Sequence, residues 1–344
     1  MILKQIFLKN YRNFTSDKFG FNPLLTIIIG ENAKGKTNLL EAIFLILQGS
    51  GFRESREDEL IKFGSDSAEI MASFGSNDEQ FIFQIVIKKN EKIFLINKAK
   101  KRHFQYLKET AELVLFQPEQ IEIMTGSPDK RRRYFDSLIS SFDLEYKKRL
   151  VNYENALRKR NKILEVSRDE IALKEELSFW DTYLTENGGY ITQKRQEYVD
   201  FLNENRNVDS KEFFLDYLKN EFNQKRLDEK FELERRYRKT VIGPQKDDLQ
   251  LYQSWDSQKK NLHHFGSRSE QRLGIFWLKF NEIKYIEETL KVKPILLLDD
   301  IFSELDMQNK KLIIDLVKKY QTIVTTTEIK LLELANMPKT IIKL

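Results

Sequence analysis

The first third of the chain alternates between apolar and polar residues in the way that β-strands do. Residues 2–9 alternate, an uninterrupted apolar run follows Pro23, and three more strand-like segments cover 68–74, 81–87 and 93–96. Short polar turns at 75–78 and 89–91 separate these three segments. The pattern predicts an antiparallel meander beside the site into which the apolar run leads. Residues 114–116 predict another short strand.

The middle of the chain has helical spacing instead, with apolar residues three and four positions apart. Ser127-Pro128 predicts a helix start, because proline is favoured in the first turn. Gly188-Gly189 predicts the end of one helix, and Tyr190 the start of the next. Phe213, Phe214, Tyr217, Leu218 and Phe222 form one more stripe, which we interpret as helical. The region predicts an arm that is too irregular for a long coiled coil.

After the arm, the spacing predicts a strand over 249–252 and a helix that begins at Ser267. Four aliphatic residues then lead to Asp299 and Asp300, as in a parallel strand that is buried on both faces. A helix starting at 303–306, a strand over 322–326, a further helix and a short final strand complete the prediction.

The apolar run over 24–29 ends in a glycine-rich loop that predicts a phosphate site. Gly30, Glu31, Asn32, Ala33, Lys34, Gly35, Lys36 and Thr37 follow the pattern G-x-x-x-x-G-K-T between a predicted strand and a predicted helix. Glycine lets successive backbone N–H groups turn toward an anion, and the helix N-terminus adds partial positive charge. We expect Lys36 to reach the β- and γ-phosphates and Thr37 to bind Mg²⁺.

Two carboxylates at the end of the later aliphatic strand complete the predicted site. Open α/β sheets bind ligands beyond the carboxyl ends of their strands. We therefore expect Asp299 to hold Mg²⁺, directly or through water, and Asp300 to orient or activate the attacking water. Arg12 precedes the phosphate loop closely enough to touch a bound nucleotide, but a solvated surface arginine is an equal alternative.

Composition narrows the picture further. The 344 residues include no cysteine, which excludes disulfides and thiolate metal sites and agrees with a cytoplasmic location. His263 and His264 are adjacent, and we interpret them as part of a polar loop rather than as a metal site. No apolar run reaches the length of a membrane span, and the first residues are not a signal peptide. The net charge of +5 slightly favours polyanionic partners.

Three local basic clusters are candidate DNA contacts, although ordinary solvated surfaces are at least as common. They are residues 98–103, Arg158-Lys159-Arg160 and Arg235-Arg236-Tyr237-Arg238-Lys239.

The order of these motifs resembles the ABC-type ATPase heads of SMC proteins, and most closely the RecF family of DNA replication and repair proteins. The matching segments span the chain: 10–14, 30–43, Gly126-Ser127-Pro128 with 131–133, Gly243-Pro244 with Asp247-Asp248, and 296–306. The resemblance implies an α/β fold, a P-loop ABC/SMC-type head of mixed sheets and helices with an inserted helical arm. It divides the chain into a split head at 1–128 and 240–344 and an arm at 129–239.

The resemblance also implies a mechanism. ATP with Mg²⁺ would lie between the phosphate loop of one subunit and the serine-led motif of another, so that ATP closes a homodimer and hydrolysis releases it. Lys36, Asp300 and Ser267 would be catalytic, with Ser267 acting in trans on the partner's γ-phosphate. Residues 30–38, including Asn38, and Arg12 would bind the nucleotide. Thr37, Asp299 and Gln120 would lie at the metal. Implied partners are double- and single-stranded DNA with gapped junctions, a RecR-like protein and a recombinase of the RecA type.

Two departures from the family pattern matter. Ser269 stands where the serine-led motif normally has glycine, and its side chain can crowd the approach of the phosphate. Gln245-Lys246 replaces the usual His-Arg after Gly243-Pro244. The leading hypothesis is a slow, DNA-stimulated ATPase in recombinational repair. The alternatives are a non-catalytic ATP- and DNA-binding scaffold and another SMC-like ATPase head.

Overall fold

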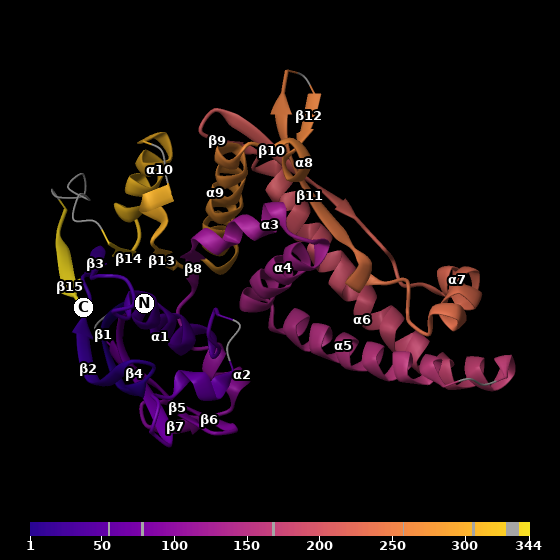
Figure 1. Ribbon diagram of the computed structural model, residues 1–344, viewed down its shortest axis with the longest axis horizontal. Helices are drawn as coiled ribbons and strands as arrows, with labels where there is room; N and C mark the ends of the chain where they lie inside the picture. Colours follow the sequence, from indigo (N-terminus) through magenta and orange to yellow (C-terminus); the bar gives the residue numbers. More distant parts are fainter. Residues whose placement is uncertain (54–55, 77–78, 167–168, 257, 305–306, 328–336) are drawn as a thin grey trace. The chain divides into compact units, whose positions relative to one another are not determined.

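The computed structural model describes residues 1–344 except 54–55, 77–78, 167–168, 257, 305–306 and 328–336. The described chain folds into two compact units. The first contains Met1–Pro118 and Ile286–Leu344, and the second contains Glu119–Tyr285. Figure 1 shows the elements of both units in sequence colours. No helix among the described residues is long and apolar enough to cross a membrane.

The first unit contains two sheets. The antiparallel meander is confirmed as a six-stranded sheet in the order β2-β1-β4-β5-β6-β7. Its strands are β1 (Ile2–Tyr11), β2 (Phe14–Gly20), β4 (Ser67–Ser76), β5 (Glu79–Lys88), β6 (Glu91–Ile96) and β7 (Ala99–Lys101). The second sheet has the order β15-β3-β14-β13-β8 and is parallel throughout. Its strands are β3 (Leu25–Ile29), β8 (Leu113–Phe116), β13 (Ile295–Asp299), β14 (Thr322–Thr326) and β15 (Lys339–Lys343).

Helix α1 (Lys36–Gln48) connects the cores of the two sheets, because it is apolar on more than one side. One buried cluster joins Ile6 and Phe83 from the first sheet, Leu40 and Ile43 from α1, and Leu297 from the second sheet. The remaining elements of this unit are short or lie at its periphery: η1 (Glu57–Leu60), α2 (His103–Leu107), η4 (Ile286–Leu290), η5 (Ile301–Glu304) and α10 (Met307–Val317). The predicted buried parallel strand at 295–299 is confirmed, since all five of its residues are buried.

The second unit combines long helices with a four-stranded sheet in the order β12-β11-β10-β9. The helices are α3 (Glu122–Thr125), α4 (Pro128–Phe142), α5 (Leu144–Glu165), α6 (Glu170–Glu204), α7 (Gln224–Tyr237), α8 (Leu262–Phe265) and α9 (Arg268–Tyr285). The strands are β9 (Asn207–Val208), β10 (Lys211–Leu218), β11 (Asp248–Trp255) and β12 (Gln258–Asn261), with short 3-10 turns at η2 (Pro118–Ile121) and η3 (Pro244–Lys246). Helices α5 and α6 pack side by side (Figure 1).

Two local predictions in this unit are wrong. Helix α6 continues through Gly188-Gly189, and Gly188 permits close packing inside the helix instead of ending it. A β-carbon at Gly188 would lie 3.1 Å from a ring carbon of Tyr153 and 3.4 Å from Pro244. The aromatic stripe at 213–218 is a strand, β10, which pairs with β11 in the register Phe213 to Gln253. Its partner is a distant segment of the chain, so local spacing could not reveal the pairing.

The other predictions about these segments have different outcomes. His263 and His264 lie in the short helix α8, capped by the Asn261 side chain, and not in a loop. The start of α4 at Pro128 after Ser127 is confirmed. The predicted helix start at 303–306 falls partly outside the described residues, as does the helix expected before the final strand. The two compact units place 119–128 and 240–285 with the arm helices, whereas the sequence-based division into head and arm placed them with the head. That functional division stays a prediction.

Candidate nucleotide-binding site

The loop from Gly30 to Thr37 connects β3 to α1, as the sequence predicts. Gly35 adopts φ +106° at the N-cap of α1, in the region where residues with a β-carbon are strained. The Lys36 side chain folds back over the loop, and its Nζ donates to the carbonyl oxygens of Gly30 (2.8 Å) and Glu31 (2.9 Å). The ammonium group is therefore fixed at the mouth of a curled backbone, which is the arrangement that holds a phosphate.

A hydroxyl and a carboxylate meet beside this loop although they lie 262 positions apart. Thr37 Oγ1 donates to Asp299 Oδ1 at 3.1 Å, and Thr325 Oγ1 donates to the same oxygen at 2.6 Å. Asp299 is 7% exposed, and burial raises the pKa of its carboxyl above the ordinary value, although the two threonine hydroxyls oppose this rise. A buried carboxylate that pairs with no cationic side chain of the described residues is a place where a metal ion would be stabilised.

This donor set fits Mg²⁺. The ion prefers oxygen ligands and usually binds one or two carboxylates together with water and substrate phosphates. One carboxylate and one hydroxyl are what Asp299 and Thr37 offer. Among the described residues, no cluster of three or more His, Cys, Asp or Glu forms a self-sufficient metal site. The ion would therefore depend on the nucleotide for its remaining ligands.

Asp300 directly follows Asp299 at the end of β13. Its backbone N–H donates to Thr325 Oγ1 at 3.0 Å, and its φ is +47°. Residues other than glycine with positive φ are uncommon and concentrate at functional sites, although aspartate adopts this conformation more readily than most. Thr325 therefore bridges the two aspartates, since its hydroxyl donates to Asp299 and accepts from Asp300.

Arg12 is not a solvated surface arginine. Its guanidinium pairs with Glu41 at 2.9 Å, donates a second bond from Nε at 3.0 Å, and donates to the carbonyl of Glu59 at 3.2 Å. Glu41 belongs to α1 and is fully buried. The arginine is thus fixed to the helix that follows the phosphate loop. A direct role toward the nucleotide stays a prediction.

Sequence reasoning missed Asn13, which is the next residue in the turn between β1 and β2. Its Nδ2 donates to the carbonyl oxygen of Lys34 at 3.1 Å, inside the phosphate loop. Its Oδ1 accepts from Asn38 Nδ2 at 2.8 Å, and Asn38 Oδ1 accepts from Arg53 at 2.9 Å. Asn38 thus connects Asn13 to Arg53, and its predicted role in binding the nucleotide stays a prediction. The signals in the sequence were that Asn13 adjoins Arg12 and belongs to the segment 10–14, which matches the family pattern.

Ser267 and Gln120 belong to the second unit. Ser267 precedes α9 and forms a capping box with Glu270: its N–H donates to the Glu270 carboxylate at 2.7 Å, and its hydroxyl accepts from the Glu270 N–H at 3.3 Å. Lys260 holds the same carboxylate with two contacts of 2.8 Å. The prediction that Ser267 starts a helix is confirmed. The trans role of Ser267 and the metal role of Gln120 remain untested.

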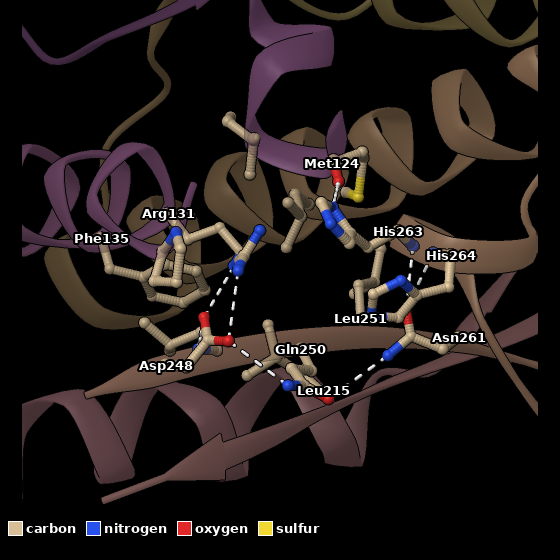
Figure 2. Close-up of a pocket in the computed structure, with 14 residues that line it drawn as sticks. Met124, Arg131, Phe135, Leu215, Asp248, Gln250, Leu251, Asn261, His263 and His264 are labelled. Carbon is tan, nitrogen blue, oxygen red and sulfur yellow. Dashed lines mark hydrogen bonds and ion pairs between the residues drawn. The ribbon is translucent and has the colours of Figure 1, made fainter. Parts of the chain in front are cut away.

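A pocket of about 180 Å³ is lined mainly by residues of α3, α4, β11 and α8 (Figure 2). Arg131 and Asp248 form an ion pair with two hydrogen bonds, of 2.8 and 3.1 Å, on one side of it. On the other side His263 Nδ1 lies 2.6 Å from the carbonyl oxygen of Met124, so this nitrogen donates and connects α8 to α3. The pocket therefore lies between the Arg131–Asp248 ion pair and the His263–Met124 hydrogen bond. His263 lies shortly before Ser267 in the chain.

The curled phosphate loop after β3 and the carboxylate at the end of β13 in the same parallel sheet define a P-loop head of the ABC/SMC class. The sequence matches the family described as RecF/RecN/SMC N terminal domain over residues 2–343. Solved SMC heads share the fold alone: the Smc head domain from Pyrococcus furiosus with an extended coiled coil has a TM-score of 0.53 at 19% identity, covering 95% of this chain and 90% of that one.

More similar relatives specify the family. The protein named DNA replication and repair protein RecF from Thermoanaerobacter sp. (strain X514) is 34% identical over 95% of this chain and 94% of its own length. That from Natranaerobius thermophilus is 32% identical, covering 96% and 92%. The solved structure of the recombination mediator protein RecF-ATPrS in the RecFOR pathway has a TM-score of 0.86 at 30% identity, covering 95% and 93%. The chain belongs to the RecF family.

Proposed function

We propose that this protein is an ATP-gated DNA clamp of recombinational repair and replication restart. It binds ATP with Mg²⁺, dimerises while the γ-phosphate is present, and assists recombinase loading at gapped DNA together with a RecR-like partner. Slow, DNA-stimulated hydrolysis of ATP to ADP and phosphate ends each cycle. Membership of the RecF family supports ATP binding and hydrolysis, and a related RecF was solved with ATP.

The observation that carries the proposal is the Thr37–Asp299 contact at 3.1 Å. In this proposal Lys36 and the backbone of residues 30–38 hold the phosphates, while Thr37 and Asp299 hold Mg²⁺, which neutralises charge on the β- and γ-oxygens. Asp300 orients the attacking water and accepts its proton. In the proposal Gln120 would act on the metal side, and Arg12 would contact the nucleotide.

In this proposal the nucleotide site of each monomer is incomplete, and dimerisation completes it. Ser267 at the N-terminus of α9 offers a hydroxyl and helix-terminal N–H groups, which suit an anion such as a γ-phosphate. In the proposal it serves the nucleotide of the partner subunit. A γ-phosphate between two subunits is a contact that exists with ATP and is lost with ADP.

The experiment is molar mass by light scattering with ATP, ADP or no nucleotide, with and without gapped duplex DNA. We expect a monomer without nucleotide and with ADP, and a dimer with ATP that gapped DNA stabilises. Lys36→Met is the control, and it should stay monomeric under every condition. A wild-type protein that remains a monomer with ATP and DNA would contradict the clamp.

A second candidate, a non-catalytic scaffold, is favoured by Ser269, whose side chain stands where the family has glycine. Phosphate release distinguishes the two. Turnover in the wild type that disappears in Lys36→Met excludes the scaffold, while ATP binding without any release would support it.

A further inference from the structure

A shallow groove of about 260 Å³ runs between α5 and α6 in the second unit and takes no part in the site described above. Helix α5 contributes one face, and α6 contributes three aromatic side chains. The lining residues are Asn152, Asn155, Ala156, Lys159, Phe179, Trp180 and Tyr183. Its wall is mostly apolar, with two amide side chains and one ammonium group.

The aromatic side of the groove is open to solvent. Phe179 is 63% exposed, although burying its ring would be favourable. Its ring lies nearly parallel to that of Tyr183 and meets Trp180 edge to face. Lys159 Nζ lies 4.9 Å from the centre of the Trp180 ring. Clustered exposed aromatic rings with a cation over one of them are typical of a binding surface.

The cations around the groove differ from others on the same helices. Arg149 pairs with Glu145 and Glu186, and Lys174 pairs with Glu170. In contrast, Arg158, Lys159 and Lys162 are exposed, and none forms a salt bridge with a carboxylate in the described part of the chain. Their charge is therefore available to an anionic ligand.

A second basic segment, distant in sequence, is also held against α5, but its arginines line a pocket other than the groove. Thr240 donates from its backbone N–H to Asn161 Oδ1 at 2.8 Å, and Glu234 pairs with Arg160 at 2.7 Å. These contacts hold the end of α7 against α5. The exposed residues that follow Arg235 are Arg236, Tyr237, Arg238 and Lys239, whose cations also form no salt bridge to a described carboxylate.

Two members of the basic clusters already have carboxylate partners. Arg160 is 1% exposed and pairs with Asp181 and Glu234. Arg235 pairs with Glu170 and Glu232. The sequence-based hypothesis that both clusters face DNA is therefore wrong for the buried Arg160, and it stays a prediction for the other residues.

We propose that the α5–α6 groove and the cations beside it bind single-stranded DNA. Phosphates contact Arg158, Lys159 and Lys162, and an unpaired base stacks on the exposed ring of Phe179 or Trp180. Stacking requires a base that is free of its complement, which favours a single strand over duplex DNA. A protein segment would not need three unpaired cations. The identity of the nucleic acid as DNA rests on the proposed function.

The test measures binding of a fluorescent oligothymidylate without nucleotide, so that it is independent of the clamp. We expect Phe179→Ala to weaken binding about fivefold or more, which is the typical loss for one stacked base. Lys159→Gln should reduce the slope of log Kobs against log salt by about 0.7, the effect of one phosphate contact on a single strand. Phe179→Ala should leave that slope unchanged.

Trp180 provides a second readout. We expect oligothymidylate to quench its fluorescence, Trp180→Phe to remove that quenching but retain binding, and Trp180→Leu to lose binding, because phenylalanine keeps a stacking face. Phe265→Ala and Lys225→Gln are matched controls, since both residues are exposed in the same unit and lie outside the groove. Both should bind like the wild type.

Two results would overturn the inference: oligothymidylate affinity unchanged in Phe179→Ala and Lys159→Gln, or equal losses in the groove variants and the controls. Loss of duplex binding alone would also overturn it. ATP affinity and ATP-dependent dimerisation, measured on the same variants, should equal the wild-type values. If ATP binding or ATP-dependent dimerisation fails in these measurements, the result concerns the proposed clamp and not the groove.

Discussion

The side-chain amide nitrogen of Asn13 lies 2.5 Å from the position that a β-carbon would occupy at Gly35. The two residues belong to different elements, the β1–β2 turn and the phosphate loop. Asn13 can donate to Lys34 only because Gly35 has no side chain. The phosphate loop is thus shaped by a residue outside its own motif.

Gly35→Ala should abolish detectable ATP binding, because the new methyl group would collide with Asn13 and the alanine would have to adopt φ +106°. Asn13→Ala should weaken ATP binding about three- to tenfold, the effect of one lost hydrogen bond. Titration with a fluorescent ATP analogue measures both. In the double variant the collision is absent but the backbone strain remains, so binding should stay weak. A double variant that binds like Asn13→Ala would refute the strain argument.

Asp299→Asn should abolish Mg²⁺-dependent ATP binding while leaving the nucleotide-free protein at least as stable as the wild type. Burial raises the pKa of the folded carboxyl above its unfolded value. The contribution of Asp299 to stability is therefore present at low pH and is lost as pH rises through the folded pKa. Asparagine does not ionise, so the variant does not lose this stability as pH rises. Urea unfolding at about pH 4 and pH 7 tests the sign, and a variant that is less stable than the wild type at the higher pH would contradict it.

Asp300→Asn should slow ATP turnover by about a hundredfold or more, as expected for loss of a general base, and should prolong the ATP-bound dimer. Phosphate release gives the first quantity and light scattering the second. Unlike Asp299→Asn, this variant should still bind ATP. If it turns over ATP at the wild-type rate, the role that we propose for Asp300 is wrong.

Ser269→Gly should raise ATP turnover and the dimer fraction, because glycine restores room for the phosphate beside the start of α9. Ser267→Ala is the opposing variant and should prevent dimerisation. Both are measured with saturating ATP and gapped DNA. No increase with glycine would mean that Ser269 does not limit closure.

Arg195→Met should destabilise the second unit by about 3–5 kcal/mol, the usual effect of leaving buried carboxylates without their partner. Arg195 is 2% exposed and pairs with Asp136 and Asp247, each at 2.8 Å. Lys194→Met is the matched control, since Lys194 pairs with Glu197 at the surface and should cost less than about 1 kcal/mol. Denaturant unfolding that gives similar losses for the two variants would contradict the importance of the buried pairs.

The candidate nucleotide site could be predicted from the sequence because each of its parts has a local signature. The glycine-rich loop predicted the position of Lys36 and Thr37, and four aliphatic residues before Asp299 predicted a buried parallel strand end. Parallel strands align their carboxyl ends, so the meeting of Thr37 and Asp299 could be expected before the structure was known.

The errors arose where tertiary contacts decide the outcome. Glycine is typical of a helix end, which is why the sequence predicts one at Gly188. Tyr153 and Pro244 pack so closely on it that the helix interior requires a small residue there. The apolar residues around Phe213 have a spacing that we interpreted as helical. Its backbone nevertheless pairs with that of Gln253 in a sheet. Asn13 and Arg160 each donate a hydrogen bond to a residue 21 positions away. No rule of local spacing identifies such a partner.

The order of strands β15-β3-β14 has a consequence for synthesis on the ribosome. Strand β3, which leads into the phosphate loop, ends at Ile29, but both of its neighbours come from residues 322–343. The second unit, in contrast, is one continuous segment from 119 to 285. The loop therefore lacks its supporting sheet until almost the whole described chain has been translated, and a nascent chain cannot engage ATP before its helical arm has had time to fold.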